Sequence, residues 1–351
     1  MRKPDLDKIQ ELHARLASAE SPVIVTHMKP DGDAIGSSLG MLHTLKLYGK
    51  NAVMTASDQA PANLDFLLSD APEGSCIFHD RNKEAAEKAI AESDLIICLD
   101  FNAFHRTGTL EKALSESKAD KILIDHHLSP DLNKFVLVFS ETEVSSASEL
   151  LYHIIKELPP IGGKVSSIPS KAATALMTGM TTDTNNFANS VYPSTLRMAS
   201  ELIEAGVDRD SIIRNIYNRF KESRIRLQGH ILKDLMTITE DGVAYVVLDK
   251  KTLEKYNVEE GDTEGFVNIP LSIDKVVMSI LAKEDNGYAR VSIRSKKGIS
   301  ANRCSNLHFH GGGHENAAGG RIYFPEDVCS IEEAAGYIES HTHAFMNENY
   351  E

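Results

Sequence analysis

Over the first part of the chain, short hydrophobic runs alternate with segments whose apolar residues recur at helical spacing. The hydrophobic runs are predicted to be buried strands, at 21–27, 51–57, 95–98, 121–124 and 135–139. The other segments are predicted to be helices, at 6–18, 33–48, 61–68, 83–91, 170–180 and from the capping box Ser146–Glu149 onward. This alternation of strand and helix predicts a parallel sheet with helices on both faces.

The pattern changes in the second part of the chain. Residues 194–204 and 209–234 are predicted to be helices with no strand between them. Three further strands are predicted at 243–248, 275–283 and 288–295, and the turn Asp285-Asn286-Gly287 between the last two is typical of a hairpin. A hairpin in this position indicates a small mixed sheet rather than a continuation of the parallel one.

These patterns predict an α/β protein in three parts. We expect a parallel-sheet domain over residues 1–190, a helical connector over 191–236 and a smaller α/β domain with a mixed sheet over 237–351. The length of 351 residues agrees with two domains, since domains usually contain about 100–200 residues.

Composition narrows the classes of function. Acidic residues outnumber basic ones by 51 to 37, and the formal charge of −14 disfavours a protein that coats long nucleic acids. No apolar run approaches the ~18 residues of a membrane span, and the charged first helix lacks the apolar centre of a signal peptide. Four cysteines without any C-x-x-C pair argue against a zinc knuckle or a disulfide framework. We therefore expect a soluble cytoplasmic protein with reduced thiols.

Ionisable side chains follow three of the predicted strands. They are His27, Asp31 and Asp33 after the first, Asp100 after the strand at 95–98, and Asp125, His126 and His127 after the strand at 121–124. In parallel sheets ligands bind beyond the carboxyl ends of the strands, so these groups are expected to converge. Asp183, within Met180–Phe187, is counted as a fourth motif at the end of a strand. A single Asp after a strand is more simply a helix N-cap or a turn residue, but four such motifs together favour a shared site.

Carboxylates and imidazoles without a thiolate favour Mn²⁺ or Mg²⁺ over a softer metal. Asp31 and Asp33 are spaced to serve one each of two adjacent ions, and Asp100 and Asp183 are expected to bridge or close the pair. Neighbouring residues usually point apart, so one of His126 and His127 can bind metal while the other faces a phosphate as a hydrogen-bond donor or acid. Asp125 is expected to orient an imidazole.

The predicted strand at 288–295 carries a group of basic residues. Five cations and no acidic residue lie between positions 290 and 303, namely Arg290, Arg294, Lys296, Lys297 and Arg303. A solvated edge strand protected by charge is the alternative interpretation. The glycine run that ends in Gly312, Gly313 and His314 follows, and its backbone N–H groups, with a helix expected to start there, favour phosphate binding.

These motifs resemble those of the DHH phosphoesterase superfamily. The resemblance rests on HMKPDGDAIGS at 27–37, the LD that ends at Asp100, DHH at 125–127 and TTD at 181–183. It implies a two-metal phosphoesterase that usually depends on Mn²⁺. The implied metal ligands are His27, Asp31, Asp33, Asp100, His126 and Asp183, and the implied catalytic residues are His127, near the phosphate, and Asp125.

The segment from GFVNIPLSID to GGGHENAAGG resembles the DHH-associated C-terminal domain, and more narrowly that of the nanoRNase, or NrnA-like, branch of the family. The resemblance implies that substrate is bound by Arg294, Ser295, Gly312, Gly313 and His314. In the first domain, the chain departs from the family pattern at Asn185, just after the TTD motif, where many relatives have glycine.

We therefore expect hydrolysis of short RNA and of 5′-phosphorylated dinucleotides such as pGpG and pApA to mononucleotides. The molecule 3′-phosphoadenosine 5′-phosphate (PAP) is a further expected substrate. No membrane or long duplex nucleic acid is expected as a partner, and a homodimer is left open. The alternatives are a cyclic dinucleotide phosphodiesterase with the same metal centre and, from another class, a non-catalytic nucleotide-binding sensor.

Overall fold

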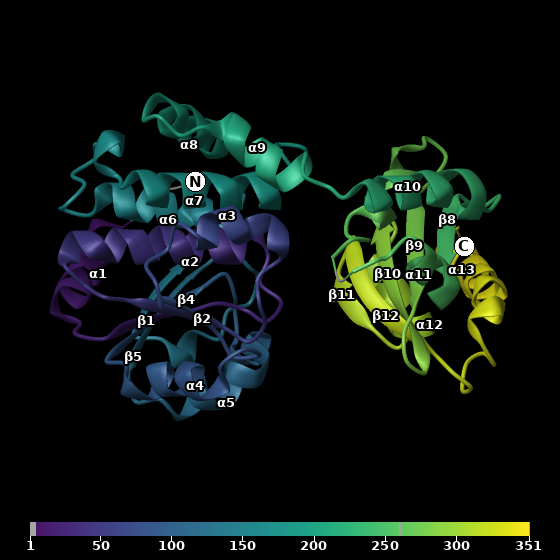
Figure 1. Ribbon diagram of the computed structural model, residues 1–351, viewed down its shortest axis with the longest axis horizontal. Helices are drawn as coiled ribbons and strands as arrows, with labels where there is room; N and C mark the ends of the chain where they lie inside the picture. The colour runs from purple at the N-terminus through teal and green to yellow at the C-terminus, as the bar shows by residue number, and fades with distance from the viewer. Residues whose placement is uncertain (1–4, 260, 351) are drawn as a thin grey trace. The chain divides into compact units, whose positions relative to one another are not determined.

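The chain folds into two compact units that divide between Arg219 and Phe220 in a computed structural model. The structure describes residues 5–259 and 261–350. Each unit is built around its own sheet and its own hydrophobic core (Figure 1). In the described part of the chain, no helix is both long enough and apolar enough to span a membrane.

The first unit contains the predicted parallel sheet. Its strands pair in the order β3-β2-β1-β4-β5-β6, and every pair is parallel. They are β1 (Pro22–Val25), β2 (Val53–Ala56), β3 (Cys76–Phe78), β4 (Leu95–Leu99), β5 (Asp120–Asp125) and β6 (Leu137–Ser140). The short strand β3 was not predicted. Strand order reverses between β1 and β4, and open parallel sheets bind ligands at such a switch point.

Helices cover both faces of this sheet, as the sequence predicted (Figure 1). One face carries α1 (Leu6–Ser18), α2 (Gly32–Leu45), α6 (Ala147–Glu157) and α7 (Ser170–Asp183), with the short α3 (Asp65–Leu68) beside α2. The other face carries α4 (Lys83–Glu92) and α5 (Glu111–Glu116). Successive residues of the central strands point to opposite faces of the sheet, and each face has its own hydrophobic cluster. Ile24 and Ile97 belong to the cluster under α2 and α7, and Val25 and Cys98 belong to the cluster under α4 and α5.

Helices α2 and α7 pack antiparallel at very short range, because three glycines of α2 face α7. A Cβ on Gly32 would lie 2.2 Å from Thr182 Oγ1, and one on Gly36 would lie 2.6 Å from the carbonyl oxygen of Ala175. A Cβ on Gly40 would lie 2.6 Å from Leu176 Cδ2. The crossing therefore requires glycine, and it sets the beginning of α2 beside the end of α7.

The second unit contains the predicted mixed sheet, in the order β11-β12-β10-β9-β8-β7. Its strands are β7 (Thr237–Ile238), β8 (Val243–Leu248), β9 (Met278–Glu284), β10 (Tyr288–Ser295), β11 (Gly312–His314) and β12 (Ala317–Tyr323). Among the described strands of this sheet, only the pair β8–β9 is parallel. The helices are α10 (Glu222–His230), α11 (Lys250–Lys255), α12 (Ala301–His308) and α13 (Ala334–Tyr350). Ala289, Val291 and Ile293 of β10 are buried, so the alternation predicted for this strand is present.

The helices expected between 191 and 236 are divided between the two units. Helices α8 (Pro193–Glu204) and α9 (Arg209–Tyr217) place Met198 and Ile212 in the core of the first unit. Helix α10 instead packs Leu227 against the second unit. The single helix predicted for 209–234 ends at Tyr217, and a π-helical turn, Ile231–Leu235, follows α10.

One expectation and one alternative interpretation for the second unit were wrong. No helix starts at the glycine run, because residues 312–314 form β11 and pair with β12, while α12 ends before the run. The basic strand β10 is not an edge strand, because it pairs with β12 on one side and β9 on the other. Local glycine content favours a loop or turn, whereas the observed strand depends on pairing with a partner farther along the chain.

Candidate metal centre

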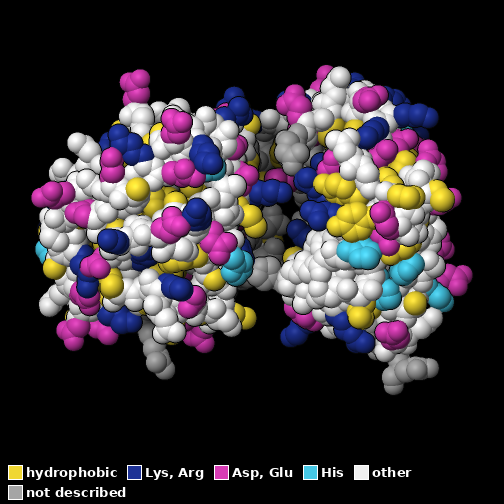
Figure 2. Space-filling view, turned by 90° about the horizontal axis from the view of Figure 1, so that it is seen from below, with side chains coloured by type: hydrophobic (Ala, Val, Ile, Leu, Met, Phe, Trp, Pro, Cys, Tyr) yellow, Lys and Arg dark blue, Asp and Glu magenta, His cyan; other side chains and the backbone are white. Residues whose placement is uncertain are grey.

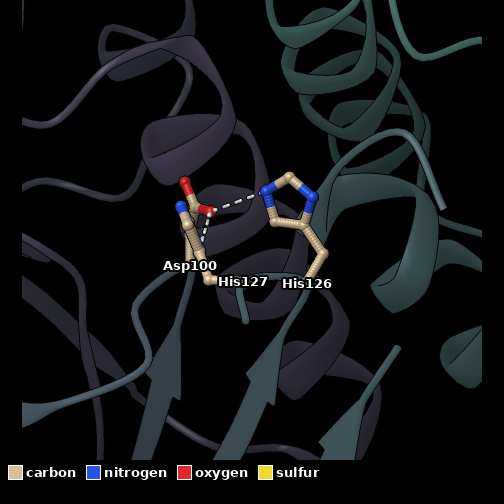
Figure 3. Close-up of side chains that lie close together, drawn as sticks. All are labelled: Asp100, His126 and His127. Carbon is tan, nitrogen blue, oxygen red and sulfur yellow. Dashed lines mark ion pairs between the residues drawn. The ribbon is translucent and has the colours of Figure 1, made fainter. Parts of the chain in front are cut away.

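Asp100 lies at the centre of a cluster of imidazoles and carboxylates in the first unit. Its Oδ1 is 3.5 Å from His126 Nε2 and 3.8 Å from His127 Nδ1, and its Oδ2 is 3.5 Å from His27 Nε2. Figure 3 shows His126 and His127, just beyond β5, beside the Asp100 carboxylate, which follows the neighbouring strand β4. The cluster thus lies at the switch point of the sheet.

Three groups of side chains in the described part of the chain can hold a metal ion, each with ligand atoms within 4.8 Å of one another. They are His27–Asp31–Asp100, Asp33–His126–Asp183 and Asp100–His126–His127. Because Asp100 directs one oxygen to His27 and the other to His126, it can be shared between the first two groups. Among the described residues, Asp100 Oδ1 is buried without a hydrogen-bond partner, and an ion would supply the missing contact. Oxygen and imidazole donors of this kind fit Mn²⁺ or Mg²⁺.

Asp31 and Asp33 are positioned by helix ends. Asp31 caps α2 and accepts hydrogen bonds from the amides of Asp33 and Ala34. The alternative interpretation of this residue as a helix N-cap is therefore correct, although Asp31 also lies in one of the groups that can hold a metal ion. Asp33 is only 2 % exposed, and its two oxygens accept from the amides of Ala147 at 2.6 Å and Ser148 at 2.9 Å. The positive end of α6 therefore holds Asp33 in place. Sequence reasoning found the capping box at Ser146 but not this contact, which joins segments remote along the chain.

Asp183 reaches the cluster from a helix, so its assignment to the end of a strand was wrong. It is the last residue of α7, and its Oδ2 lies 3.7 Å from His126 Nε2. The close crossing of α2 and α7 brings it there. Gly179, one turn earlier, has no room for a Cβ, which would lie 2.0 Å from Ser148 Oγ and 2.9 Å from Asp33 Oδ1.

His127 is oriented by Asp125. The Nδ1–H of His127 donates to Asp125 Oδ1 at 2.7 Å, and Asp125 is fully buried at the end of β5. Similarly, His27 Nδ1 donates to the carbonyl of Met28, so that its Nε2 is the nitrogen that faces Asp31 and Asp100. Such contacts fix the tautomer and the direction of an imidazole.

The crowded charges shift the pKa values of the cluster. Burial opposes the charged form of both histidines, but the Asp100 carboxylate outweighs it, raising the pKa of His27 to about 9 and that of His126 to about 10. Burial raises the pKa of Asp183 to about 7, and the nearby Asp100 contributes in the same direction. Burial also raises the pKa of Asp33. These shifts favour protonation of the cluster in the metal-free protein, so protons and cations are expected to compete for the same side chains.

We expect the stability of the metal-free protein to fall as the pH rises from about 6 to 9. The raised pKa of His27 and His126 provides stability below their unfolded value near 6.5, which is lost as the pH rises toward 9 and 10. The contribution of Asp183 to stability also falls with rising pH, because its raised pKa provides stability at low pH that is lost as the pH rises through about 7.

Divalent cations replace these protons, so Mn²⁺ should raise the unfolding temperature more at pH 8 than at pH 6. Thermal unfolding with Mn²⁺ or with EDTA at both pH values measures the difference. A shift that is equal at the two pH values, or larger at pH 6, would contradict a cluster in which protons and cations compete.

The loop after Asp183 explains the departure at Asn185. Asn185, Asn186 and Phe187 have positive φ angles of 46°, 57° and 67°. Glycine adopts this left-handed conformation without strain, and asparagine is among the side chains that tolerate it best. The Thr184 hydroxyl also accepts a hydrogen bond from the Phe187 amide. Asn185 therefore occupies a position that suits glycine, and the turn is kept.

The predicted substrate-binding residues do not all share one face of the second unit. Arg294 is half-buried on the face of β10 opposite the core, and the register places Ala317 directly between Arg294 and His314. The side chain of His314 lies outside the described part. Gly312 and Gly313 lie in β11. Ser295 is on the core side, 7 % exposed, and its hydroxyl donates to the carbonyl of Ile299 at 2.6 Å.

Comparison with known proteins agrees with the motifs. Residues 22–180 match the model of the DHH family N-terminal domain, and residues 240–338 match that of the DHHA1 domain. The bifunctional oligoribonuclease and PAP phosphatase NrnA of Thermus thermophilus is 29% identical over 323 residues, which are 90% of this chain and 89% of that protein. The resemblance inferred from the motifs is confirmed.

Two other relatives extend the comparison. The crystal structure of an exopolyphosphatase-related protein from Bacteroides fragilis is 36% identical, with a TM-score of 0.91 and full coverage of both chains. The cyclic-di-AMP phosphodiesterase PdeA of Listeria monocytogenes is 26% identical over 282 residues, which are 76% of this chain but 41% of PdeA. The chain thus spans less than half of the second relative.

Proposed function

The chain belongs to the DHH family of phosphoesterases, and we propose that it is a two-metal, Mn²⁺-dependent enzyme that hydrolyses short RNA and 5′-phosphorylated dinucleotides to mononucleotides. The observation that supports this most is the position of Asp100 between two groups of ligands. A carboxylate shared in this way is suited to two ions that act on one phosphate.

We assign His27 and Asp31 to one ion, Asp33, His126 and Asp183 to the other, and Asp100 to both. When bound, the ions would supply Lewis-acid stabilisation of the phosphoryl oxygens. The contact between Asp33 and the start of α6 would hold that ligand rigidly while the ions and substrate exchange.

His127 is assigned to the scissile phosphate rather than to a metal. Asp125 accepts a hydrogen bond from His127 Nδ1, so Nε2 is the nitrogen left for the substrate, and when it also carries a proton it can donate to a phosphate oxygen or to the leaving group. In the second unit, Arg294, Gly312, Gly313 and His314 are assigned to the substrate phosphate. Ser295 is assigned to support of the 295–299 turn, because its hydroxyl already donates to Ile299.

A substrate panel tests the proposed function. Purified protein with Mn²⁺ should release mononucleotides from pGpG, pApA and RNA of two to ten residues, and phosphate from 3′-phosphoadenosine 5′-phosphate, the substrate class named for its NrnA relative. The absence of mononucleotide product from every linear substrate would contradict the proposal.

A cyclic dinucleotide phosphodiesterase is the second candidate, because the Listeria relative is named for cyclic di-AMP. Faster hydrolysis of cyclic di-AMP than of pApA under the same conditions would favour it. Binding of Mn²⁺ and of nucleotides without any hydrolysis would instead favour the non-catalytic sensor.

Replacing Arg294 with glutamine should raise KM for pApA by about tenfold or more, since a charge-assisted hydrogen bond contributes about 1.5–3 kcal/mol. The effect on kcat should be smaller, because Arg294 is assigned to binding. Among the described residues no carboxylate lies within ion-pair distance of Arg294, and its Nη1 donates only to the carbonyl of Ile293. Steady-state kinetics measures both constants. A fall in kcat with KM unchanged would place Arg294 in the chemical step instead.

A further inference from the structure

Glu149, in the first turn of α6, is a fully buried carboxylate. Figure 2 shows acidic and basic side chains mixed over the visible surface of the first unit, which is the usual place for such groups. Among the described residues, no lysine or arginine lies within ion-pair distance of Glu149. A buried charge without partners is costly, so the groups around Glu149 must account for its place.

Hydrogen bonds hold the Glu149 carboxylate on two sides. Its Oε2 accepts from the amide and the hydroxyl of Ser145, at 2.9 Å and 2.5 Å, and from the hydroxyl of Thr195 in α8 at 2.6 Å. Its Oε1 lies 3.6 Å from His153 Nε2. Burial disfavours the charged form, but His153 and the surrounding donors outweigh it and lower the pKa of Glu149 to about 2. The carboxylate is therefore charged at neutral pH.

These contacts differ from those of a complete capping box. The Ser146 hydroxyl accepts a hydrogen bond from the Glu149 amide at 2.9 Å, which is one half of the box. In the other half, the glutamate would turn back to the amide of Ser146. The Glu149 carboxylate instead reaches the residue before Ser146 and a second helix. Local capping of α6 therefore does not explain where this side chain points.

The turn that Glu149 holds carries the two amides that bind Asp33. The amides of Ala147 and Ser148 donate to the Asp33 carboxylate at 2.6 Å and 2.9 Å. Glu149 binds Ser145 just before these two residues, and it joins the chain just after them to α8. The turn is thus fixed on both sides of the amides that orient a metal ligand. Groups that orient a ligand in this way influence how tightly the metal is bound.

We propose that Glu149 is a positioning residue for the metal ion assigned to Asp33. By joining the first turn of α6 to α8, it keeps the two amides where they orient the Asp33 carboxylate, without being a ligand itself. This role rests on the two-metal assignment of the proposed function. Loss of the Glu149 charge should therefore weaken one Mn²⁺ site and leave the site of His27 and Asp31 unchanged.

Calorimetric titration of the full-length protein with Mn²⁺ tests this role without turnover. Glu149→Gln should weaken one of the two Mn²⁺ sites by about tenfold, the lower end of the effect expected when a group that supports a metal ligand is changed. The lower end applies because glutamine keeps an oxygen acceptor for Ser145. Hydrolysis of pApA by the variant should need about tenfold more Mn²⁺ to reach half of its maximal rate.

Glu201→Gln is the matched control, because the Glu201 carboxylate of α8 also joins α8 to α6. It accepts hydrogen bonds from Tyr152 and Lys156, which lie farther along α6 than the amides that bind Asp33. Both variants should unfold at lower denaturant concentration in EDTA, but Glu201→Gln should keep wild-type affinity at both Mn²⁺ sites. Equal weakening of Mn²⁺ binding in the two variants, or unchanged Mn²⁺ affinity in Glu149→Gln, would overturn the proposal.

Thr195→Val provides a second test if Glu149→Gln does not fold. It removes the hydroxyl that donates to Glu149 from α8 and changes the shape of the side chain little. The same Mn²⁺ site should be weakened, by a smaller factor than in Glu149→Gln. Wild-type affinity at both sites in Thr195→Val would then overturn the positioning role.

The positioning role and the proposed function fail in different ways. If the wild type binds two Mn²⁺ ions but hydrolyses no linear substrate, while Glu149→Gln loses affinity at one site, the proposed function fails and the positioning role stands. If the wild type hydrolyses pApA and Glu149→Gln binds both ions as tightly as the wild type, the positioning role fails and the function stands.

Discussion

Replacement of Asp100 by asparagine is expected to lower kcat for pApA by at least about 10³-fold, because this carboxylate is the one ligand that both ions are proposed to share. An amide has nearly the same shape as a carboxylate but offers one neutral oxygen acceptor. Asp100 is 2 % exposed, and both of its oxygens face histidines, at 3.5 Å from His27 and 3.5 Å from His126. The substitution therefore removes the negative charge where the two groups of ligands meet.

Metal binding distinguishes this effect from unfolding. Asp100→Asn should bind fewer than two Mn²⁺ ions per chain by equilibrium dialysis, while its circular dichroism remains that of the wild type. Asp210→Asn is a suitable control, since Asp210 is an exposed carboxylate in the first turn of α9. Normal metal content together with normal activity in Asp100→Asn would exclude a shared ligand at this position.

The variant Gly179→Ala should destabilise the first unit by about 1–3 kcal/mol, the range for overpacking a well-packed interior. The added methyl group has no space, since Ser148 Oγ would be 2.0 Å away and Asp33 Oδ1 2.9 Å away. Movement of α7 to relieve the clash would displace Asp183, and movement of α6 would displace the amides that hold Asp33. Misplacement by about 1 Å can lower a rate by about 10²-fold, so activity should fall by that order.

Chemical denaturation and steady-state kinetics measure the two effects of this change. Gly336→Ala provides the control, because Gly336 lies in α13 with no atom within 4 Å of an added Cβ. That change should stabilise the protein by up to about 1 kcal/mol, since alanine is the better helix former. Wild-type stability and activity in Gly179→Ala would mean that the contact between α6 and α7 adapts without disturbing the metal ligands.

Much of the first unit was predictable, because its central strands are short, fully buried and bounded by polar residues. A buried parallel strand reads as a continuous hydrophobic run, and its carboxyl end is marked by the first ionisable side chain. His27, Asp100 and His126 were therefore found from position alone, and the structure brings them together. In the second unit, alternation in β10 similarly identified its buried residues.

The remaining features depended on contacts between remote segments. Asp183 was recognised by its motif, but its place at the end of α7 follows from the glycines that let α2 and α7 cross closely. The support of Asp33 by the start of α6 depends on a contact between residues more than 100 positions apart. The glycine run became a strand only because β12 was available to pair with it.

The sequence by itself determined which residue types occur, which segments bury an apolar face and where each central strand stops. Those properties are local, since the spacing of apolar residues records the repeat of a helix or a strand. Only the tertiary structure decided that Asp100 directs its two oxygens to different histidines and that Glu149 of α6 accepts a hydrogen bond from Thr195 of α8. Both follow from contacts between segments that are distant along the chain, and such contacts leave no periodic signal within either segment.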